Sequence, residues 1–171
     1  MDEARFLRAL IWHDHGEPLT GGDENASNKT KYKGVREWIA VYNLISDWPE
    51  ALRLQFLEVF SLQFVLKDEW EDLPREGRDI VRRLRASHYR EAVIFDFTER
   101  WDYFFSALTG HDQAVHNGEE AIMEHTFGRQ ADAMDGLVSE FPVLGTIWTP
   151  TIRSQLESMA NQDSRSPLFI S

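Results

Sequence analysis

Three side chains near the N-terminus have the types and spacing of a metal-dependent hydrolytic site. His13 and Asp14 are adjacent, and Glu17 follows three residues after Asp14. An imidazole and a carboxylate are ligands for divalent cations, and a second carboxylate within reach can orient or deprotonate a bound water. The alternatives are that the His-Asp pair is an accidental dipeptide with a surface role and that Glu17 is a solvent-exposed loop residue.

A second pair of acids lies in the middle of the chain. Glu99 and Asp102 are three residues apart in a segment whose other residues are mostly aromatic or aliphatic. Burying a carboxylate without a cation or hydrogen-bond donors costs free energy, so this pair indicates either a metal site or an ion pair with an Arg such as Arg90 or Arg100. Helical spacing alone does not choose between these two roles.

The elements that carry these acids are predicted to be helices, because apolar residues recur at steps of three and four. The predicted helices cover residues 2–12, 35–46, 50–66, 74–84 and 89–108, followed by one that ends at Pro142 and one that begins at Thr149-Pro150. The first helix carries the apolar stripe Phe6, Leu7, Leu10 and Ile11 and ends at His13. No segment alternates like a strand for more than a few residues, so we expect an all-α fold.

The composition suits one compact domain. The chain has 171 residues, of which 42% are hydrophobic, including eleven Phe and six Trp, so it can build a sizeable core. We find no repeat and no linker that would divide it. We therefore expect a single helical domain over residues 1–162 and a frayed tail over residues 163–171.

Charge and residue usage exclude several functional classes. The formal charge of −11 repels phosphate backbones, so no nucleic-acid partner is expected, although a small anionic substrate is still compatible with a local cation. The chain has no Cys, so any metal must be held by His and carboxylates. No signal peptide and no apolar run of about 20 residues occurs, so we expect a soluble cytoplasmic protein and no membrane partner.

Two stretches of this sequence resemble the HD-domain metal-dependent phosphohydrolases, in particular the 5′-deoxynucleotidase-like branch. Residues 9–23, ALIWHDHGEPLTGGD, are similar to the family's apolar helix, its His-Asp pair, a Glu three residues on, and a loop ending in Gly-Asp. Residues 91–102, EAVIFDFTERWD, are similar to the family's Glu-Ala followed by a metal-binding Asp, a Lys and a further acid. The likeness extends from about Glu3 to Leu108 and leaves the C-terminal third unplaced.

The resemblance implies a helical HD-domain-like bundle that hydrolyses nucleotides, with deoxynucleoside phosphates as the first choice of substrate. It implies His13, Asp14 and Glu99 as ligands of a divalent metal (Mn, Co, Mg, Zn or Fe) and Glu17 and Asp23 as catalytic residues. The related enzymes carry a Lys near the phosphate, and Lys31, which lies in a polar loop with Lys29 and Lys33, is the candidate for that role. The alternative for these lysines is a solvated loop.

The sequence also departs from the family pattern. Glu99 stands where the family has Asp, Arg100 stands where it has Lys, and an extra Gly precedes Asp23. The family's first metal-binding His lies on a helix about thirty residues before the His-Asp pair, whereas the twelve residues before His13 contain no His. His15 or His111 could replace that ligand only if the fold brings one of them near.

Three interpretations of the absent His stay open. The sequence lacks an N-terminal helix relative to the family, a neighbouring chain supplies the His, or the protein is a catalytically weakened or inactive form. The last interpretation gives the alternative function, a nucleotide sensor or a module that binds a partner. The abundance of aromatic residues and the apolar surface that a missing helix would expose favour a homodimer.

Overall fold

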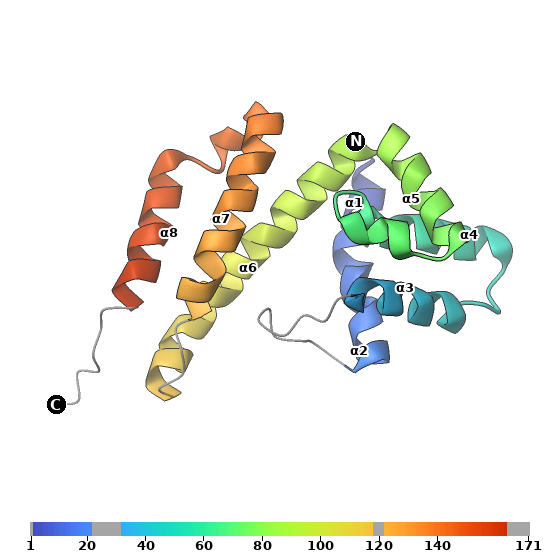
Figure 1. Cartoon of the computed structure of the whole chain (residues 1–171), viewed down its shortest axis with the longest axis horizontal. Coiled ribbons are helices and arrows are strands. Elements are labelled where there is room, and N and C mark those ends of the chain that lie inside the picture. The colour runs from blue at the N-terminus through green and yellow to red at the C-terminus, as the bar shows by residue number, and fades with distance from the viewer. Residues whose placement is uncertain (1, 22–31, 118–121, 164–171) are drawn as a thin grey trace. The chain divides into compact units, whose positions relative to one another are not determined.

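The computed structural model describes the backbone of residues 2–21, 32–117 and 122–163 (Figure 1). Side chains are described for residues 2–21, 32–105 and 127–161. Within these ranges every regular element is a helix. The expected all-α fold is therefore confirmed.

Contacts between residues divide the chain into two compact units. Unit 1 extends to Asp96 and unit 2 begins at Phe97, so the boundary falls within helix α6, Tyr89–Asn117. The expected single domain over residues 1–162 with a tail over 163–171 stays a prediction, and the tail from residue 164 onward lies outside the described ranges.

Unit 1 consists of helices and short 3-10 turns that precede or begin α6. Its elements are α1 (Glu3–Trp12), η1 (His13–Gly16), α2 (Glu17–Thr20), α3 (Lys33–Leu44), α4 (Glu50–Phe60), η2 (Ser61–Phe64), η3 (Asp68–Asp72), α5 (Arg75–Ser87) and the first turns of α6. Asp2 caps α1, because its carboxylate accepts a hydrogen bond from the backbone N–H of Arg5 at 3.1 Å. Pro49 and Pro74 lie at the N-caps of α4 and α5, where a missing N–H costs nothing.

The core of unit 1 is aromatic and surrounds Trp38 of α3. Trp38, Phe60 and Phe64 are fully buried, and Trp38 donates its indole N–H to the buried hydroxyl of Ser61 at 2.9 Å. Gly77 of α5 lies against the same indole, since a Cβ at Gly77 would be 3.0 Å from it. This packing fixes α3 against η2 and α5, and α3 and η2 contact the His13 turn.

Two of the predicted helices differ in detail from the sequence-based expectation, one in which side it buries and one in its length. In α1, Phe6 and Leu10 are partly buried, whereas Leu7 is 57% and Ile11 66% exposed. The helical periodicity is correct, but α1 buries the side centred on Ala9 against α4. The predicted helix over residues 50–66 also divides, because its last turns form η2.

Unit 2 comprises the rest of α6 together with α7 (Ile122–Glu140), η4 (Pro142–Thr146) and α8 (Pro150–Asp163). Trp148 joins these elements, since its ring stacks on Phe104 at 5.4 Å and meets Trp101 edge-on at 5.8 Å. Thr149 caps α8 by accepting the N–H of Ile152 at 3.2 Å, as the sequence predicts. Within the described residues, no helix combines the length and apolar character needed to cross a membrane.

Candidate functional site

His13 lies in the 3-10 turn that directly follows α1, and its two ring nitrogens have different partners. Nδ1 is 2.8 Å from the carbonyl oxygen of Leu10, which can only accept, so Nδ1 carries the proton. Nε2 is 3.0 Å from Oδ1 of Asp14. Because Nδ1 already carries a proton, either a second proton on Nε2, which makes the ring an imidazolium that donates to Asp14, or a cation bound by both groups must lie between Nε2 and the carboxylate.

The hydrogen bond from Nδ1 of His13 to a backbone carbonyl is one that metal-binding histidines also make. Ligating imidazoles commonly donate their second N–H to a backbone carbonyl, which fixes the tautomer and the ring orientation. Two oxygen or nitrogen ligands on adjacent corners of an octahedron with bonds near 2.1 Å are about 3 Å apart. The separation between Nε2 of His13 and Oδ1 of Asp14 therefore fits two adjacent ligands of one divalent ion.

The turn is fixed from both sides by unit 1. The side-chain amide of Gln63 in η2 donates to the carbonyl of His13 at 3.1 Å, and the ring of Phe95 meets the imidazole edge-on at 5.5 Å. The carboxylate of Asp14 is exposed, and the hydrogen bond from His13 lowers its pKa, with partial burial opposing and the charges of Lys33 and Lys67 adding to the effect. Asp14 is thus an ionised carboxylate that faces solvent beside an oriented imidazole.

Glu17 begins α2 and takes part in a buried charge cluster with Lys33 and Glu37. Nζ of Lys33, the first residue of α3, is 3.0 Å from Oε1 of Glu17 and 3.5 Å from Oε1 of Glu37. The side chains of Lys33 and Glu37 are each only 8% exposed. Oε1 of Glu37 has no hydrogen-bond donor among the described residues. Lys33 therefore balances the negative charge of Glu37 as an ion-pair partner at 3.5 Å.

The electrostatics of this cluster follow from burial. Burial raises the pKa of Glu37, the positive charge of Lys33 opposes that rise, and the negative charge of Glu17 adds to it. Burial alone lowers the pKa of Lys33, but the hydrogen bond to Glu17 and the charge of Glu37 outweigh it, so the pKa of Lys33 is raised. Lys33 is therefore a permanent cation that fixes the Glu17 carboxylate.

Gly16 allows η1 and α3 to approach closely enough for this cluster to form. A Cβ at Gly16 would be 2.6 Å from Cβ of Glu37. Since Gly16 lies between the His-Asp pair and Glu17, its close contact with α3 sets the distance between the candidate ligands and the charge cluster.

The remaining predicted residues lie in unit 2 or outside the described residues. Glu99 belongs to unit 2, where Oε1 accepts from the Tyr103 hydroxyl at 3.4 Å and Oε2 is buried without a donor among the described residues. Asp102 is exposed. Asp23 and Lys31 lie outside the described residues, and the metal set His13, Asp14 and Glu99 stays a prediction.

The other two candidate histidines also give no third ligand in the described part of the chain. The side chain of His15 is exposed, and that of His111 lies outside the described side chains. Among the residues that the structure describes, no group of three His, Asp or Glu side chains is close enough to hold a metal ion. The described residues therefore give a pair of adjacent donors at His13 and Asp14.

Sequence reasoning missed Lys33 and Glu37 as members of the site. The composition around Lys33 predicts a polar loop shared with Lys29 and Lys31, but Lys33 begins α3 and is buried. The signal was present, because Lys33, Glu37 and Val41 recur at four-residue steps and so share the buried side of α3 with Trp38. Two opposite charges four residues apart on an inward-facing line indicate a buried pair.

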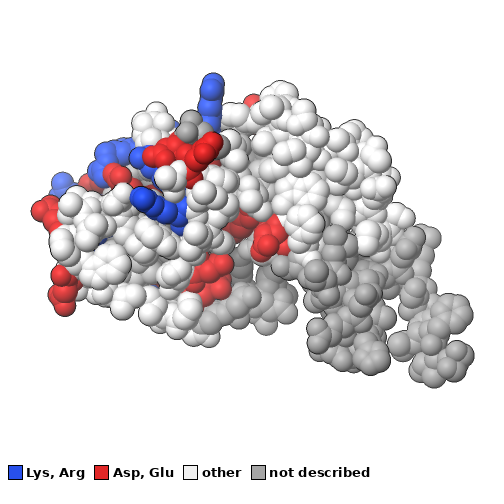
Figure 2. All heavy atoms as spheres, turned by 180° about the vertical axis from the view of Figure 1, so that it is seen from behind, with Lys and Arg blue, Asp and Glu red and all other residues white. Residues whose placement is uncertain are grey.

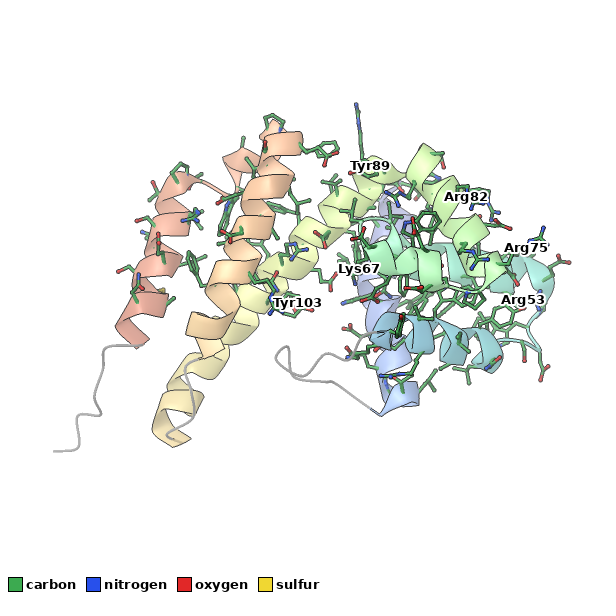
Figure 3. All side chains as sticks on the ribbon, viewed as in Figure 1. Arg53, Lys67, Arg75, Arg82, Tyr89 and Tyr103 are labelled. Carbon is green, nitrogen blue, oxygen red and sulfur yellow. The ribbon has the colours of Figure 1, made fainter. Side chains whose placement is uncertain are left out.

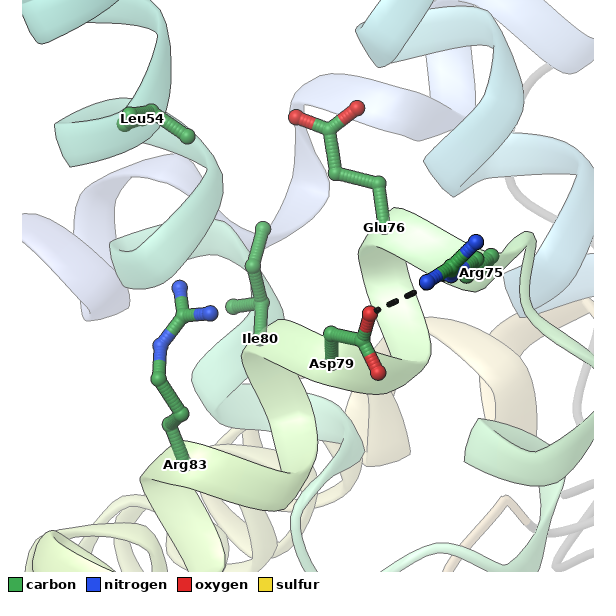
Figure 4. A pocket seen from close by; sticks show the side chains of 6 residues that line it. All are labelled: Leu54, Arg75, Glu76, Asp79, Ile80 and Arg83. Carbon is green, nitrogen blue, oxygen red and sulfur yellow. Dashed lines mark ion pairs between the residues drawn. The ribbon is translucent and has the colours of Figure 1, made fainter.

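A pocket lies elsewhere in unit 1, between α4 and α5 (Figure 4). Its lining consists of Leu54, Arg75, Glu76, Asp79, Ile80 and Arg83. Arg75 is 3.8 Å from Asp79, and Arg83 is 3.5 Å from Glu58. Both arginines that line the pocket therefore already have acidic neighbours. None of the predicted site residues that the structure describes lines it.

Comparisons of this chain with models of known protein families, with curated proteins and with solved structures find no match. The resemblance to HD-domain phosphohydrolases therefore rests on the residues quoted above.

Proposed function

We propose that this protein is a metal-dependent phosphohydrolase of the HD type that acts on nucleotides, with deoxynucleoside phosphates as its first substrates. The observation that carries the proposal is the His13 arrangement, in which Nδ1 donates to a backbone carbonyl and Nε2 and the Asp14 carboxylate converge at 3.0 Å. Glu17, one turn further along the chain, is held as an ion-paired carboxylate by Lys33 at 3.0 Å. The resemblance adds Glu99 and Asp23 to the proposed set.

The reaction is hydrolysis of a phosphate ester. A divalent cation at His13 and Asp14 would supply Lewis acidity to water and to the phosphoryl group. Glu17 orients the attacking water and accepts its proton, and Lys33 keeps Glu17 in place for that role. The oxygen of water forms a bond to phosphorus, the bond from phosphorus to the ester oxygen breaks, and the leaving alkoxide takes up a proton to give a nucleoside and inorganic phosphate.

The second candidate function is a nucleotide sensor or a dimeric partner-binding module without turnover. The observation that favours it is that the described residues bring together two adjacent metal ligands, whereas catalytic zinc sites usually have three protein ligands and structural ones four. A homodimer in the cytoplasm belongs to both versions of the proposal. The exposed apolar side chains Leu7 and Ile11 on α1 offer surface for a second chain.

Metal content and turnover test the proposal together. Protein purified without chelator is analysed for bound metal, and phosphate release is measured from deoxynucleoside mono- and triphosphates with Mn²⁺, Co²⁺ or Mg²⁺. We expect bound metal and turnover in the parent, loss of both in Asp14→Asn, and retained metal without turnover in Glu17→Gln. Asp47→Asn, an exposed Asp in the turn before α4, is the matched control and should behave like the parent.

The outcomes separate the two candidate functions. A parent that binds nucleotide without releasing phosphate is a sensor, and the enzyme proposal is then wrong. A parent that binds no metal, or an Asp14→Asn variant that retains metal and turnover, removes His13 and Asp14 as the metal site.

A further inference from the structure

Lys67, labelled in Figure 3, lies in the short connection between η2 and η3. These two turns contact the His13 turn and the start of α3. Gln63 of η2 donates to the carbonyl of His13 at 3.1 Å. Phe64 of η2 lies against Gly34, the residue after Lys33, because a Cβ at Gly34 would be 2.9 Å from its ring. The connection that carries Lys67 is therefore packed between the His13 turn and the start of α3.

The ammonium group of Lys67 is held in place by an aromatic ring. Nζ is 5.9 Å from the centroid of the Phe64 ring, a distance at which a cation is attracted to the ring face. The side chain is half-buried, and its backbone N–H donates to the carbonyl of Phe64 at 3.3 Å. Lys67 is thus more restricted than a lysine on an open surface.

Its charge is not matched by a carboxylate at ion-pair distance within the described part of the chain, since Phe64 is the partner found there. Lys33 differs, because two carboxylates share its ammonium at 3.0 and 3.5 Å. The charge of Lys67 nevertheless reaches the site: it contributes to the lowered pKa of Asp14 and opposes the raised pKa of Glu37. Among the described lysines beside this acidic cluster, Lys67 is the one whose charge no described carboxylate matches at ion-pair distance.

We propose that Lys67 binds the phosphate group of the substrate beside His13 and Asp14. The proposal rests on the phosphohydrolase function proposed above and adds a substrate-binding residue to it. The carboxylates of Asp14, Glu17 and Glu37 give this region negative charge, and Lys33 is already neutralised by two of them. Attraction of a dianion then requires a further cation, and a lysine ammonium is a common point-charge ligand for phosphate.

Binding of inorganic phosphate to the full chain tests this role without requiring catalysis. Isothermal titration with phosphate is carried out with Mn²⁺ present on the parent, Lys67→Met, Lys67→Gln and Lys67→Arg. We expect the neutral variants to bind phosphate about tenfold more weakly or worse, because a hydrogen bond to a charged group is lost. Lys67→Arg should restore most of the affinity. Arg75→Met is the control, since the Arg75 side chain is 90% exposed and lies at the other pocket.

Turnover provides a second measurement. With a nucleoside monophosphate as substrate, Lys67→Met should raise KM by about the factor by which it weakens phosphate binding, with a smaller change in kcat. A purely structural lysine would instead lower the midpoint of thermal unfolding and leave KM unchanged. Thermal unfolding of every variant is measured in parallel, and the comparison with Lys67→Gln and Lys67→Arg remains available if Lys67→Met does not fold.

The failure of this inference is distinguishable from the failure of the proposed function. Phosphate binding that depends on Lys67 in a parent without turnover leaves the inference standing and makes the phosphohydrolase proposal wrong. Turnover in the parent with unchanged KM and phosphate affinity in the neutral variants makes the inference wrong and leaves the function standing. A parent that binds no phosphate overturns the inference.

Discussion

Each unit of this protein contains a cluster of charged side chains around one cation, and the two clusters differ in how completely the charges are paired. In unit 2, Asp135 of α7 accepts from the indole N–H of Trp148 at 2.7 Å and from Nε of Arg153 at 2.9 Å. The hydrogen bond to Asp135 is the main reason that the pKa of Arg153 is raised. Both oxygens of Asp135 have donors, and both members of the ion pair remain partly exposed.

The cluster of unit 1 is more buried and less completely paired. Lys33 and Glu37 are each 8% exposed, two carboxylates share one ammonium, and Oε1 of Glu37 lacks a donor among the described residues. On the face shown in Figure 2, charged side chains gather over unit 1, and the described surface of unit 2 is mostly uncharged. Incompletely compensated buried charge costs stability and is frequent where a protein has to bind or transform a ligand.

The difference indicates separate roles for the two clusters. The cluster around Asp135 joins α7 to α8 with ordinary partly exposed interactions, so it accounts for structure. The cluster around Lys33 holds Glu17 beside the His13 turn at a cost in free energy, so it favours a functional role for that carboxylate. Substitutions at equivalent points of the two clusters test this comparison.

The largest difference is expected when the central cation of each cluster is replaced by a similarly long apolar side chain. Lys33→Met leaves the buried carboxylate of Glu37 next to the partly exposed carboxylate of Glu17 without Lys33 as their cation, and we expect a loss of about 3 to 5 kcal/mol in the free energy of unfolding. Arg153→Met removes interactions that are partly exposed, and we expect a loss of about 1 kcal/mol or less. Urea denaturation followed by circular dichroism measures both, and equal losses would contradict the contrast between the clusters.

Glycine substitutions give the next largest contrast. Gly16→Ala places a methyl group 2.6 Å from Cβ of Glu37, so α3 and η1 must separate, and we expect a loss of about 1 to 3 kcal/mol. Gly136 lies inside α7, and a methyl group added there would have no atom within 4 Å, so Gly136→Ala should stabilise unit 2 by about 0.5 to 1 kcal/mol. Thermal unfolding of the two variants should therefore shift in opposite directions. A stabilising Gly16→Ala would show that η1 and α3 are not held in close contact.

The helices were largely predictable from the sequence, because local signals determine them. Pro74 before α5, the Thr149-Pro150 pair before α8 and Pro142 after α7 mark helix ends in the sequence, and the helices begin or end at these points. The burial of Ile80 and Val81 on the inner side of α5 was also predictable from periodicity. The buried side of α1 could not be predicted in this way, because the exposed Leu7 and Ile11 are as apolar as the residues that pack inward.

The candidate site was predictable in its residue types and less so in its contacts. His13, Asp14 and Glu17 follow from a local motif. The hydrogen bond from Gln63 to the carbonyl of His13 joins residues 50 positions apart, so packing of η2 against η1 determines it rather than any local pattern. Charge pairing across a polar loop, as between Glu17 and Lys33, depends in the same way on how helices pack.

The smallest expected effect is a change in the pH dependence of stability caused by Glu37→Gln. Burial raises the pKa of Glu37 above its usual value of 4.5, so the folded protein retains a proton that the unfolded chain releases. The free energy of unfolding of the parent therefore falls as pH rises from 4.5 through the raised pKa. Glu37→Gln has no such proton to lose, and its stability relative to the parent should improve over the same interval.

The other charges of the cluster do not obscure this difference. The lowered pKa of Asp14, caused first by the hydrogen bond from His13, contributes stability that is lost as pH falls, but Asp14 is present in both proteins and cancels in the comparison. The raised pKa of Lys33 acts only in the alkaline range above its usual value of 10.5. Urea denaturation at intervals between pH 4.5 and 7 measures the effect, with the exposed Glu71→Gln as the control. Parallel pH profiles for Glu37→Gln and the parent would mean that Lys33 compensates Glu37 fully, and the contrast with the Asp135 cluster would then rest on burial alone.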